Sequence, residues 1–308
     1  MGPGHEKLSS KSWVNKAALF DYYSKWFSPQ ILAGLIECEH RSVRFHQMHG
    51  DPAGEQIKLK AQGVQLDPLP FYPQAAWIIN SSAVDKLDPH SSAYYLQDPA
   101  SLLPVLALQA QPGERVLDLC AAPGGKSLFL ADLMNYQGTL WANEISAARF
   151  LRLKHNFQRF KVPWEQEQWE LKLLHQTPRD IAAEHPHSFD KVLLDVPCSM
   201  EAHVLQNSEE LKKWSPSRSH LLAKRQRKIF KAGLACAKPG GTIVYSTCSI
   251  SPLENEENIE FLLSKFKDQI VIDESCPLNI GWKRKYGYLV LPSEHHMGPM
   301  YYCVLTKL

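Results

Sequence analysis

From Arg115 onward, apolar segments that suit β-strands alternate with amphipathic segments that suit α-helices. The expected strands are Arg115–Leu119, Thr139–Asn143, Trp169–Leu174, Lys191–Asp195, Thr242–Ser246, Gln269–Asp273 and Met300–Thr306. The main helices expected between them are Lys126–Met134, Ser146–Phe160 and Leu222–Ala237. Repeated strand–helix units join parallel strands through right-handed crossovers. The pattern therefore predicts an α/β fold, a doubly wound, mostly parallel seven-stranded sheet with helices on both faces.

Two of the helix predictions can be tested residue by residue. The inner face of Ser146–Phe160 is expected to carry the apolar residues Ala147, Phe150, Leu151 and Leu153. A further helix should open after Ser251, which suits an N-cap, with Pro252 at its first position. Glu254 would complete the capping box.

Residues 1–90 have a different character. An aromatic-rich helix is expected at Lys16–Phe27, a short strand at Arg41–Phe45 and a loop at Pro68–Pro73. At 308 residues the chain is long enough for one large domain with a smaller companion. We therefore expect a small N-terminal α+β domain over residues 1–90 and a catalytic domain over residues 91–308.

The cysteine pattern and the ends of the chain bound the environment of the protein. The seven cysteines include no C-x-x-C pair, so no metal site is expected and a reducing compartment is predicted. No apolar run reaches the length of a membrane span. The first residues form neither a signal core nor an Arg-rich presequence, which predicts a cytoplasmic protein. A mitochondrial matrix location stays open if a presequence has been removed.

A glycine-rich turn follows the first strand of the α/β region, in the sequence VLDLCAAPGGKS from Val116 to Ser127. Gly124 and Gly125 would let backbone N–H groups approach an anionic ligand at a helix N-terminus. The spacing fits neither G-x-G-x-x-G nor the Walker pattern. Glu144 ends the second strand, where an acidic side chain can hold a ribose diol. Together these features favour a nucleoside ligand.

Two cysteine-bearing segments lie where strands of the same sheet should end, Asp195-Val196-Pro197-Cys198-Ser199 and Ser246-Thr247-Cys248-Ser249. Two thiols at one sheet edge, beside a cofactor turn, indicate covalent chemistry. The dipole of a helix beginning near Ser251 would favour the Cys248 thiolate. The remaining cysteines suit packing positions, as small buried hydrophobic residues. They are Cys38, Cys120, Cys236, Cys276 and Cys303.

From Tyr95 to its C-terminus the chain resembles the NOL/Sun family of RNA 5-methylcytosine methyltransferases, which includes bacterial rRNA enzymes and mitochondrial members. The resemblance rests on VLDLCAAPGGKS, LLDVPCS, KPGGTIVYSTCSISPLENEEN and the segment beginning at Tyr95. It implies a Rossmann-like class I methyltransferase fold and S-adenosylmethionine as cofactor. By the resemblance, the turn that wraps the methionine part is Cys120, Ala121, Ala122, Pro123, Gly124, Gly125 and Lys126. Glu144 would bind the ribose, with Arg149 nearby and Asp195 at the edge of the cofactor site.

One cofactor motif departs from the family. Where the family usually has D-G-R, this chain has His175-Gln176-Thr177-Pro178-Arg179. Gln176 or Thr177 can still accept a hydrogen bond from the adenine amino group through a neutral oxygen. We expect a somewhat weaker affinity for the cofactor.

The resemblance also assigns roles to the two thiols. Carbon 5 of cytosine becomes nucleophilic only after a thiolate adds to carbon 6, and a base must later remove the carbon-5 proton. The family assigns attack to Cys248 and release to Cys198. Asp195 would bind the cytosine at N3 and its amino group, and Lys126 would contact the base or Asp195.

The net charge of +2 does not by itself indicate a nucleic-acid partner, but local clusters do. A basic stretch between the two cysteine motifs suits phosphate contact, and its principal residues are Lys212, Lys213, Trp214, Arg218 and Arg225. A second patch is expected at Arg41, Arg44, Lys58 and Lys60. His203 suits substrate contact and loop structure equally well. Because a duplex hides the reacting carbons, the target cytosine should be single-stranded or flipped out.

These observations favour an RNA cytosine-5-methyltransferase acting on rRNA or tRNA, with or without a protein partner for targeting. A DNA cytosine-5-methyltransferase would use Cys198 as nucleophile and leave Cys248 without a role. A catalytically silent RNA-binding or assembly factor is supported only by the departures at Gln176–Thr177 and Met200–His203. A small-molecule methyltransferase would need neither the basic stretch nor the paired thiols. Bacterial or organellar origin, oligomeric state and the target nucleotide stay open.

Overall fold

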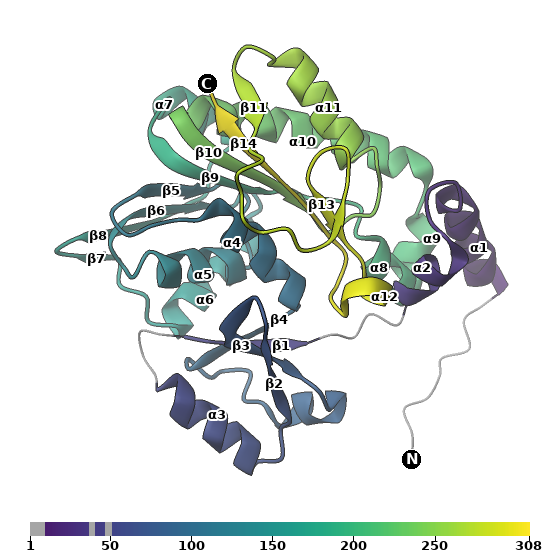
Figure 1. The fold of residues 1–308 in the computed structure, drawn as a ribbon, viewed down its shortest axis with the longest axis horizontal. Helices are drawn as coiled ribbons and strands as arrows, with labels where there is room; N and C mark the ends of the chain where they lie inside the picture. The colour runs from purple at the N-terminus through teal and green to yellow at the C-terminus, as the bar shows by residue number, and fades with distance from the viewer. Residues whose placement is uncertain (1–9, 37–40, 47–50) are drawn as a thin grey trace.

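The computed structural model describes residues 10–36, 41–46 and 51–308, which form two sheets of different size (Figure 1). The small sheet has the order β2-β3-β1-β4, with antiparallel neighbours throughout. Its strands are β1 (Ser42–Phe45), β2 (Leu66–Leu69), β3 (Tyr72–Ile78) and β4 (Tyr94–Gln97). Helix α3 (Pro52–Ala61) covers one face, where Leu59 packs with apolar residues of β1 and β3. The short helix η1 (Ser81–Lys86) connects β3 to β4.

The loop predicted at Pro68–Pro73 is wrong, because most of it belongs to a hairpin. Pro68 lies in β2 and pairs with Ala76, and only Pro70 and Phe71 form the turn. β2 is the edge strand of the sheet. An edge strand tolerates proline because one side of its backbone needs no ladder hydrogen bond.

The large sheet confirms the predicted α/β fold class. Five of its strands run parallel in the order β10-β9-β5-β6-β8, and β14 is antiparallel to β10. These strands are β5 (Arg115–Asp118), β6 (Gly138–Asn143), β8 (Trp169–Leu174), β9 (Phe189–Asp195), β10 (Ala237–Thr247) and β14 (Met300–Lys307). Shorter strands complete the sheet, namely β7 (Glu165–Gln166), β11 (Ile270–Ile272), β12 (Trp282–Lys283) and β13 (Tyr288–Val290).

Over the described residues the large sheet has ten strands where the sequence predicted seven. The three additional strands are β7, β12 and β13. Each spans only two or three residues. Such segments are too short to show the alternation of apolar and polar residues by which strands are recognised.

Alternating side chains of the central strands form an apolar core on each face of the large sheet. Val116 and Leu193 pack with helices α4, α5 and α6 on one face. Leu117 and Val192 pack with α7, α10 and α11 on the other face. The helices are α4 (Leu103–Leu108), α5 (Gly125–Leu133), α6 (Ala147–Arg159), α7 (Pro178–Glu184), α10 (Pro216–Cys236) and α11 (Glu256–Lys265). This three-layer arrangement follows from the two-residue period of a strand.

The predicted inner face of helix α6 is half right. Leu153 is buried and Phe150 is half-buried against the same core, whereas Ala147 is exposed and Leu151 is 66% exposed. Phe157, which was not predicted, is also buried. Leu151 lies two residues before Leu153 and therefore points about 200° away around the helix. Helix α10 begins at Pro216, earlier than predicted, and ends at Cys236 as the following Pro-Gly-Gly sequence indicated.

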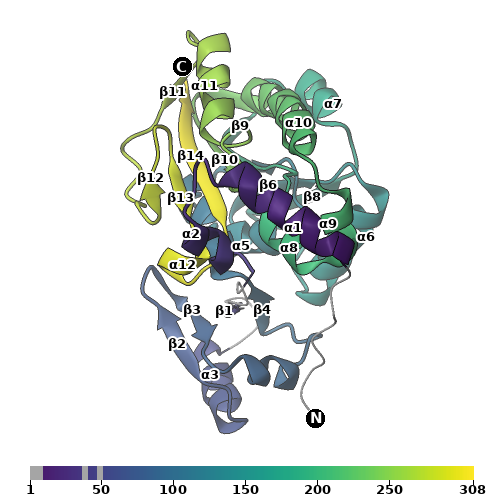
Figure 2. The same cartoon turned by 90° about the vertical axis from the view of Figure 1, so that its right-hand side faces the viewer.

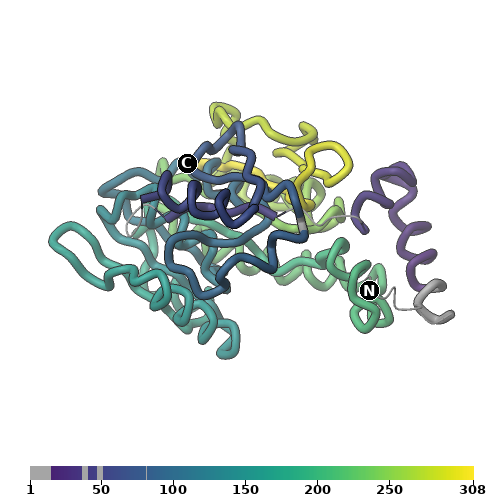
Figure 3. Tube along the Cα trace, turned by 90° about the horizontal axis from the view of Figure 1, so that it is seen from below, coloured from purple at the N-terminus to yellow at the C-terminus, as the bar shows by residue number. Residues whose placement is uncertain are grey.

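The first helices lie against the large sheet and its neighbouring helices rather than on the small sheet. Leu19 and Tyr23 belong to the core that contains α7, α10 and α11, together with residues of α2. Figures 2 and 3 show α1 beside α9, at the end of the molecule opposite β7 and β8. The additional helices at this end are α1 (Ser10–Tyr23), α2 (Pro29–Gly34), α8 (Glu201–Gln206), α9 (Ser208–Lys213) and α12 (Pro292–His295). The division at residue 90 stays a prediction.

A buried ion pair joins the small sheet to helix α5, which covers one face of the large sheet. Arg44 of β1 contacts Asp132 of α5 through Nη1, and both side chains are fully buried. Tyr136 donates a hydrogen bond to Asp132 at 2.8 Å, and the Arg44 guanidinium lies 5.0 Å from the centre of the Phe129 ring. Arg44 therefore cannot belong to the basic RNA-binding patch predicted for the N-terminal region. The Arg44 charge instead pairs with Asp132 and stabilises the contact between the small sheet and α5.

Within the described residues, none of the helices combines the length and the apolar character that crossing a membrane requires.

Candidate active site

A cavity of about 200 Å³ lies at the carboxyl ends of four neighbouring parallel strands. The loops after β5, β6, β8 and β9 and one side of α10 line it. The lining residues are Leu119, Cys120, Glu144, Ile145, Thr177, Pro178, Arg179, Pro197, Arg225, Lys228 and Ile229. Ligands of open α/β sheets bind at this edge, where crossovers to opposite faces leave a crevice. The predicted cofactor residues Cys120, Glu144 and Thr177 therefore meet at one cavity.

The glycine turn has the close packing that its sequence predicted. Gly124 has a φ of 115°, in the left-handed region that favours glycine. A Cβ atom on Gly125 would lie 2.7 Å from the Tyr95 ring, so this position also requires glycine. Asp118 fixes the turn because its carboxylate accepts hydrogen bonds from the Ser127 hydroxyl at 2.6 Å and the Cys120 N–H at 3.4 Å. Burial raises the pKa of Asp118 to about 7.

Glu144 is 3% exposed and has one carboxylate oxygen available for a ligand. Its Oε1 accepts a hydrogen bond from the Ser146 N–H at 2.8 Å. Within the described structure its Oε2 accepts no hydrogen bond, although Arg149 Nη1 lies 3.3 Å away. Arg149 also donates to the Ala122 carbonyl at 2.6 Å, which ties it to the glycine turn. A ribose diol would supply the missing donors, so these residues fit a nucleoside cofactor.

The two candidates for the adenine contact have different surroundings. Thr177 lines the cavity, but its hydroxyl accepts a hydrogen bond from the Asp180 N–H at 3.2 Å as the N-cap of α7. Gln176 is not among the residues that line the cavity, and its N–H donates to Asn143 Oδ1 at 3.1 Å. Because its hydroxyl already serves the helix, Thr177 is the weaker acceptor. The adenine contact stays a prediction.

Lys126 and Asp195 form an ion pair between the glycine turn and the end of β9. Lys126 Nζ lies 2.7 Å from Asp195 Oδ2, and the Ser246 hydroxyl donates to Asp195 Oδ1 at 3.0 Å. Burial disfavours the charged form of Lys126, but the contact with Asp195 outweighs it and, aided by Cys248, raises the Lys126 pKa. Lys126 therefore carries a positive charge that Asp195 balances, within electrostatic range of Cys248.

The two thiols predicted for the chemistry lie side by side. Cys198 follows β9 and Cys248 follows β10, and the parallel register of these strands pairs Asp195 with Ser246. The sulfur atoms are 2.9 Å apart, and both cysteines are free thiols. The hydrogen bond between them and burial raise the pKa of the Cys198 thiol well above its ordinary value. Cys248 is the more exposed of the two.

The predicted helix start beside Cys248 is wrong. Helix α11 begins at Glu256, and residues from Pro252 to Asn255 form turns. Glu254 caps no helix, because its carboxylate accepts hydrogen bonds from the Ser199 N–H at 3.1 Å and Gln226 at 2.8 Å. The buried polar groups of the Cys198 loop thus compete for the carboxylate that a capping box would use. The argument from the helix dipole therefore falls, and the nearby positive charge belongs to Lys126.

The basic stretch is largely paired with acidic neighbours. Lys212 pairs with Glu209, and Lys213 and Arg218 pair with Glu210. Trp214 packs against two tyrosines of α1, with its ring centre 5.9 Å from that of Tyr22 and 6.4 Å from that of Tyr23. In contrast, Arg225 lies at the cofactor cavity. Their roles in RNA binding, and that of His203, which is exposed on α8, stay predictions.

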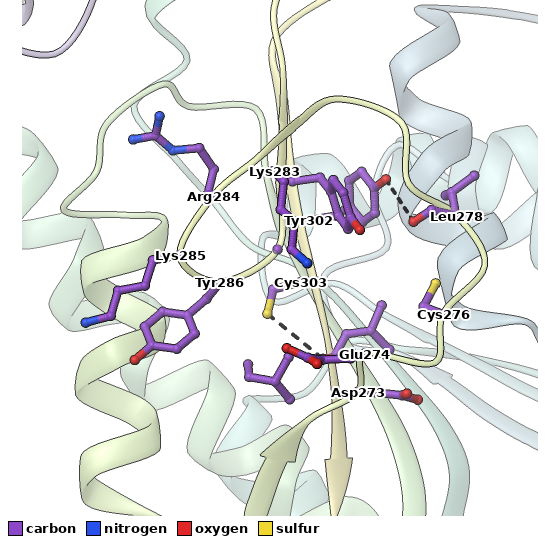
Figure 4. A pocket seen from close by; sticks show the side chains of 14 residues that line it. Asp273, Glu274, Cys276, Leu278, Lys283, Arg284, Lys285, Tyr286, Tyr302 and Cys303 are labelled. Atoms are coloured by element: carbon purple, nitrogen blue, oxygen red, sulfur yellow. Dashed lines mark hydrogen bonds between the residues drawn. The ribbon is translucent and has the colours of Figure 1, made fainter.

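Of the other cysteines that the structure describes, Cys120 lies at the cofactor cavity, and Cys236 and Cys303 are buried. Cys38 lies outside the described residues. Cys276 and Cys303 line a second cavity of about 140 Å³, between the segment after β11 and the β12–β13 hairpin (Figure 4). None of the predicted site residues lines this cavity. Across the described residues, no cluster of three or more histidine, cysteine or acidic side chains could hold a metal ion.

Met200, two residues after Cys198, has a left-handed backbone with a φ of 56°. A side chain costs about 1–2 kcal/mol there, of which the entropy of a glycine would offset part. Met200→Gly is expected to raise the free energy of unfolding by roughly 0.5–1 kcal/mol in urea titrations. Met200→Ala removes the same exposed side chain but keeps the Cβ, and should gain nothing. An equal gain in both variants would contradict backbone strain as the cause.

Comparison with known proteins extends these observations. The family described as 16S rRNA methyltransferase RsmB/F matches residues 105–306. The ribosomal RNA small subunit methyltransferase F of Cronobacter sakazakii is 34% identical over 240 residues, which cover 75% of this chain and 48% of that protein. The Klebsiella pneumoniae protein of the same name is 35% identical, with 75% and 49% covered. The chain thus spans about half the length of these relatives.

Solved structures show the same fold over nearly the whole chain. A methyltransferase homologue from Pyrococcus horikoshii has a TM-score of 0.78 and 25% identity, covering 98% of this chain and all of that one. NSun6 from the same organism also has a TM-score of 0.78, at 18% identity, covering 94% and 97% of the two chains. The Rossmann-like class I methyltransferase fold predicted from the sequence is therefore confirmed.

Proposed function

Because this chain belongs to the 16S rRNA methyltransferase RsmB/F family, we propose that it transfers a methyl group from S-adenosylmethionine to carbon 5 of a cytosine in RNA. The observation that carries the proposal is the pair of thiols 2.9 Å apart beside the cavity. Pro197, which precedes Cys198, lines that cavity. A methyltransferase that acts without a covalent adduct has no use for two adjacent thiols.

The residues around the cavity would hold the cofactor, which supplies an electrophilic methyl group when bound. Glu144 would accept hydrogen bonds from the ribose hydroxyls through its available Oε2, with Arg149 holding the carboxylate in place. The glycine turn from Cys120 to Lys126 would surround the methionine part. Its backbone can approach a ligand closely because Gly124 and Gly125 have no side chains.

Cys248 would attack carbon 6 of the cytosine as a thiolate, which makes carbon 5 nucleophilic enough to accept the methyl group. Asp195, fixed by Lys126 and Ser246, would bind the ring at N3 and the amino group. After transfer, a base removes the carbon-5 proton, and the electrons of that C–H bond re-form the C5–C6 double bond and expel the Cys248 thiolate. Cys198 would assist this release.

The relatives' names point to small-subunit ribosomal RNA as the substrate. We propose the same class for this chain, with the target cytosine unpaired or flipped out. Part of the basic stretch is neutralised by Glu209 and Glu210, which leaves His203, Arg225 and neighbouring cations as candidates for phosphate contact. The methyl-transfer assay described next, run with purified components, decides whether the chain selects its RNA alone or with a protein partner.

The test is methyl transfer from radiolabelled S-adenosylmethionine to naked 16S rRNA, small ribosomal subunits, tRNA and DNA. Label recovered as 5-methylcytidine after nuclease digestion would support the proposal. Transfer only to DNA would favour the DNA enzyme. Label in another nucleotide, or no transfer to any substrate with cell extract added as a source of partners, would overturn it.

Loss of the Glu144 carboxylate is expected to weaken cofactor binding. Glu144→Ala removes charge-assisted hydrogen bonds to the ribose, each worth about 1.5–3 kcal/mol, so Kd should rise roughly 10- to 100-fold. Isothermal titration with S-adenosylhomocysteine measures this change. Glu170→Ala removes a half-exposed acid on β8 and serves as the control. Equal affinities of wild type and Glu144→Ala would contradict the assignment.

A further inference from the structure

Two buried carboxyl groups hold the loops that carry the thiols, and the proposed chemistry does not use them. Glu201 opens α8 just after the Cys198 loop, and Glu254 lies in the turn before α11. Both residues are fully buried. Burying a carboxyl group is costly unless other groups satisfy it, so their surroundings indicate what they do.

The serine that follows each cysteine contacts this pair. The Ser199 hydroxyl lies within hydrogen-bond distance of both carboxyl groups and 2.9 Å from the Ser249 hydroxyl. Glu201 also accepts a hydrogen bond from the Ile250 N–H at 3.0 Å. The same two carboxyl groups therefore fix the Cys198 loop and the Cys248 loop relative to each other.

The other donors to the pair are uncharged. Tyr23 of α1 donates to Glu201 at 2.7 Å, and Gln226 of α10 donates to Glu254 at 2.8 Å. Neither Glu201 nor Glu254 takes part in an ion pair with any of the described residues. Burial and the neighbouring Glu201 charge raise the pKa of Glu254 to about 7. Glu254 therefore loses its proton near neutral pH and is negatively charged at higher pH.

The other ionisable groups facing the pair keep this charge uncompensated. These groups are Tyr22 and Tyr23 of α1, Tyr245 of β10 and Cys198. Glu257 of α11 raises the pKa of Tyr22 further, and Arg227 of α10 acts on Tyr245 in the opposite direction. Burial raises the pKa of all three tyrosines, so they stay neutral. The carboxylates add to the rise in the pKa of Cys198 that its contact with Cys248 and burial produce.

We propose that Glu201 and Glu254 are positioning residues that hold the Cys198 loop against the Cys248 loop and disfavour Cys198 as the attacking thiol of the pair. Two sulfur atoms 2.9 Å apart would otherwise compete for one negative charge. The buried carboxyl groups next to Ser199 disfavour that charge on Cys198. The proposal rests on the proposed function in assigning the attacking thiol.

Thiol alkylation of the free, full-length protein tests this order without RNA or S-adenosylmethionine. Iodoacetamide labelling between about pH 6 and 10, read by mass spectrometry of the Cys198 and Cys248 peptides, gives an apparent midpoint for each thiol. In the wild type, Cys248 should be labelled at the lower pH. The opposite order would overturn the proposal, and this measurement needs no variant.

The contribution of the carboxyl groups is measured in a Cys248→Ala background, where Cys198 titrates without its neighbour. Glu201→Gln and Glu254→Gln each remove a charge but keep the size of the side chain. Each should lower the Cys198 midpoint by about one pH unit. Glu257→Gln, the same change on the exposed face of α11, should leave it in place.

A midpoint that stays in place in both Gln variants, even with a lowered melting temperature, would show a merely structural role and overturn the proposal. The proposed function and the proposed role of Glu201 and Glu254 can be refuted independently. Absence of methyl transfer to RNA would leave the labelling order intact, whereas a reversed labelling order would leave methyl transfer intact.

Discussion

Cys248→Ala is expected to abolish methyl transfer to RNA, with a loss of about 10³-fold or more, because no other thiol can reach carbon 6 from the same position. Cys198→Ala should also block turnover, but at a later step. Its adduct forms and then persists, because release lacks its assisting group. The two substitutions therefore give opposite results when the covalent complex is measured rather than the product.

Denaturing gels of labelled RNA, incubated with S-adenosylmethionine and each variant, distinguish the two roles. An RNA-linked protein band should accumulate with Cys198→Ala and be missing with Cys248→Ala. Cys236→Ala, a buried thiol away from the site, is the control and should behave as the wild type. A band that persists in Cys248→Ala and disappears in Cys198→Ala would reverse the roles and favour the mechanism of a DNA methyltransferase.

Asp132→Asn is expected to lower the free energy of unfolding by about 3–5 kcal/mol, because it leaves the fully buried Arg44 charge without its partner. The effect should exceed that of substitutions at the surface or in loops. The small sheet contacts helix α5 through this ion pair, so the loss should appear in the cooperative transition. Urea denaturation followed by circular dichroism measures it.

A double substitution separates the charge from the packing. Arg44→Met with Asp132→Leu replaces both charged groups by apolar side chains of similar size and should cost less than Asp132→Asn alone. Lys58→Met, which breaks an exposed ion pair with Glu55 on α3, is the surface control and should change little. If the double variant were as unstable as Asp132→Asn, lost packing and not an unpaired charge would be the cause.

The central strands were predictable because their residues alone determine them. The centres of β5, β6 and β9 are apolar runs, and a strand buried on both faces needs little more than that. The edges of the sheet were not predictable in this way. β12 and β13 consist of two or three residues whose pairing depends on β14, a strand the chain reaches only later.

The helix faces and ends show the same limit. Apolar residues of α6 are visible in the sequence, but which of them turn inward depends on how the helix lies on the sheet. Ser251, Pro252 and Glu254 satisfy every local rule for a helix start, yet the helix begins at Glu256. The carboxylate of Glu254 bonds instead to Ser199 and Gln226, which are far away in the sequence.

The sequence by itself determined the family, the fold class, the glycine turn, Glu144 and the two cysteine motifs, because each depends on residues within a few positions of one another. Only the tertiary structure decided what surrounds these residues. The parallel register of β9 and β10 brings Cys198 and Cys248 to 2.9 Å. Folding also brings Glu201 and Glu254 to the residues that follow the two cysteines, Ser199 and Ile250. The protonation of a thiol depends on the charges within a few ångströms of it, and these charges come from distant segments that meet only in the folded chain.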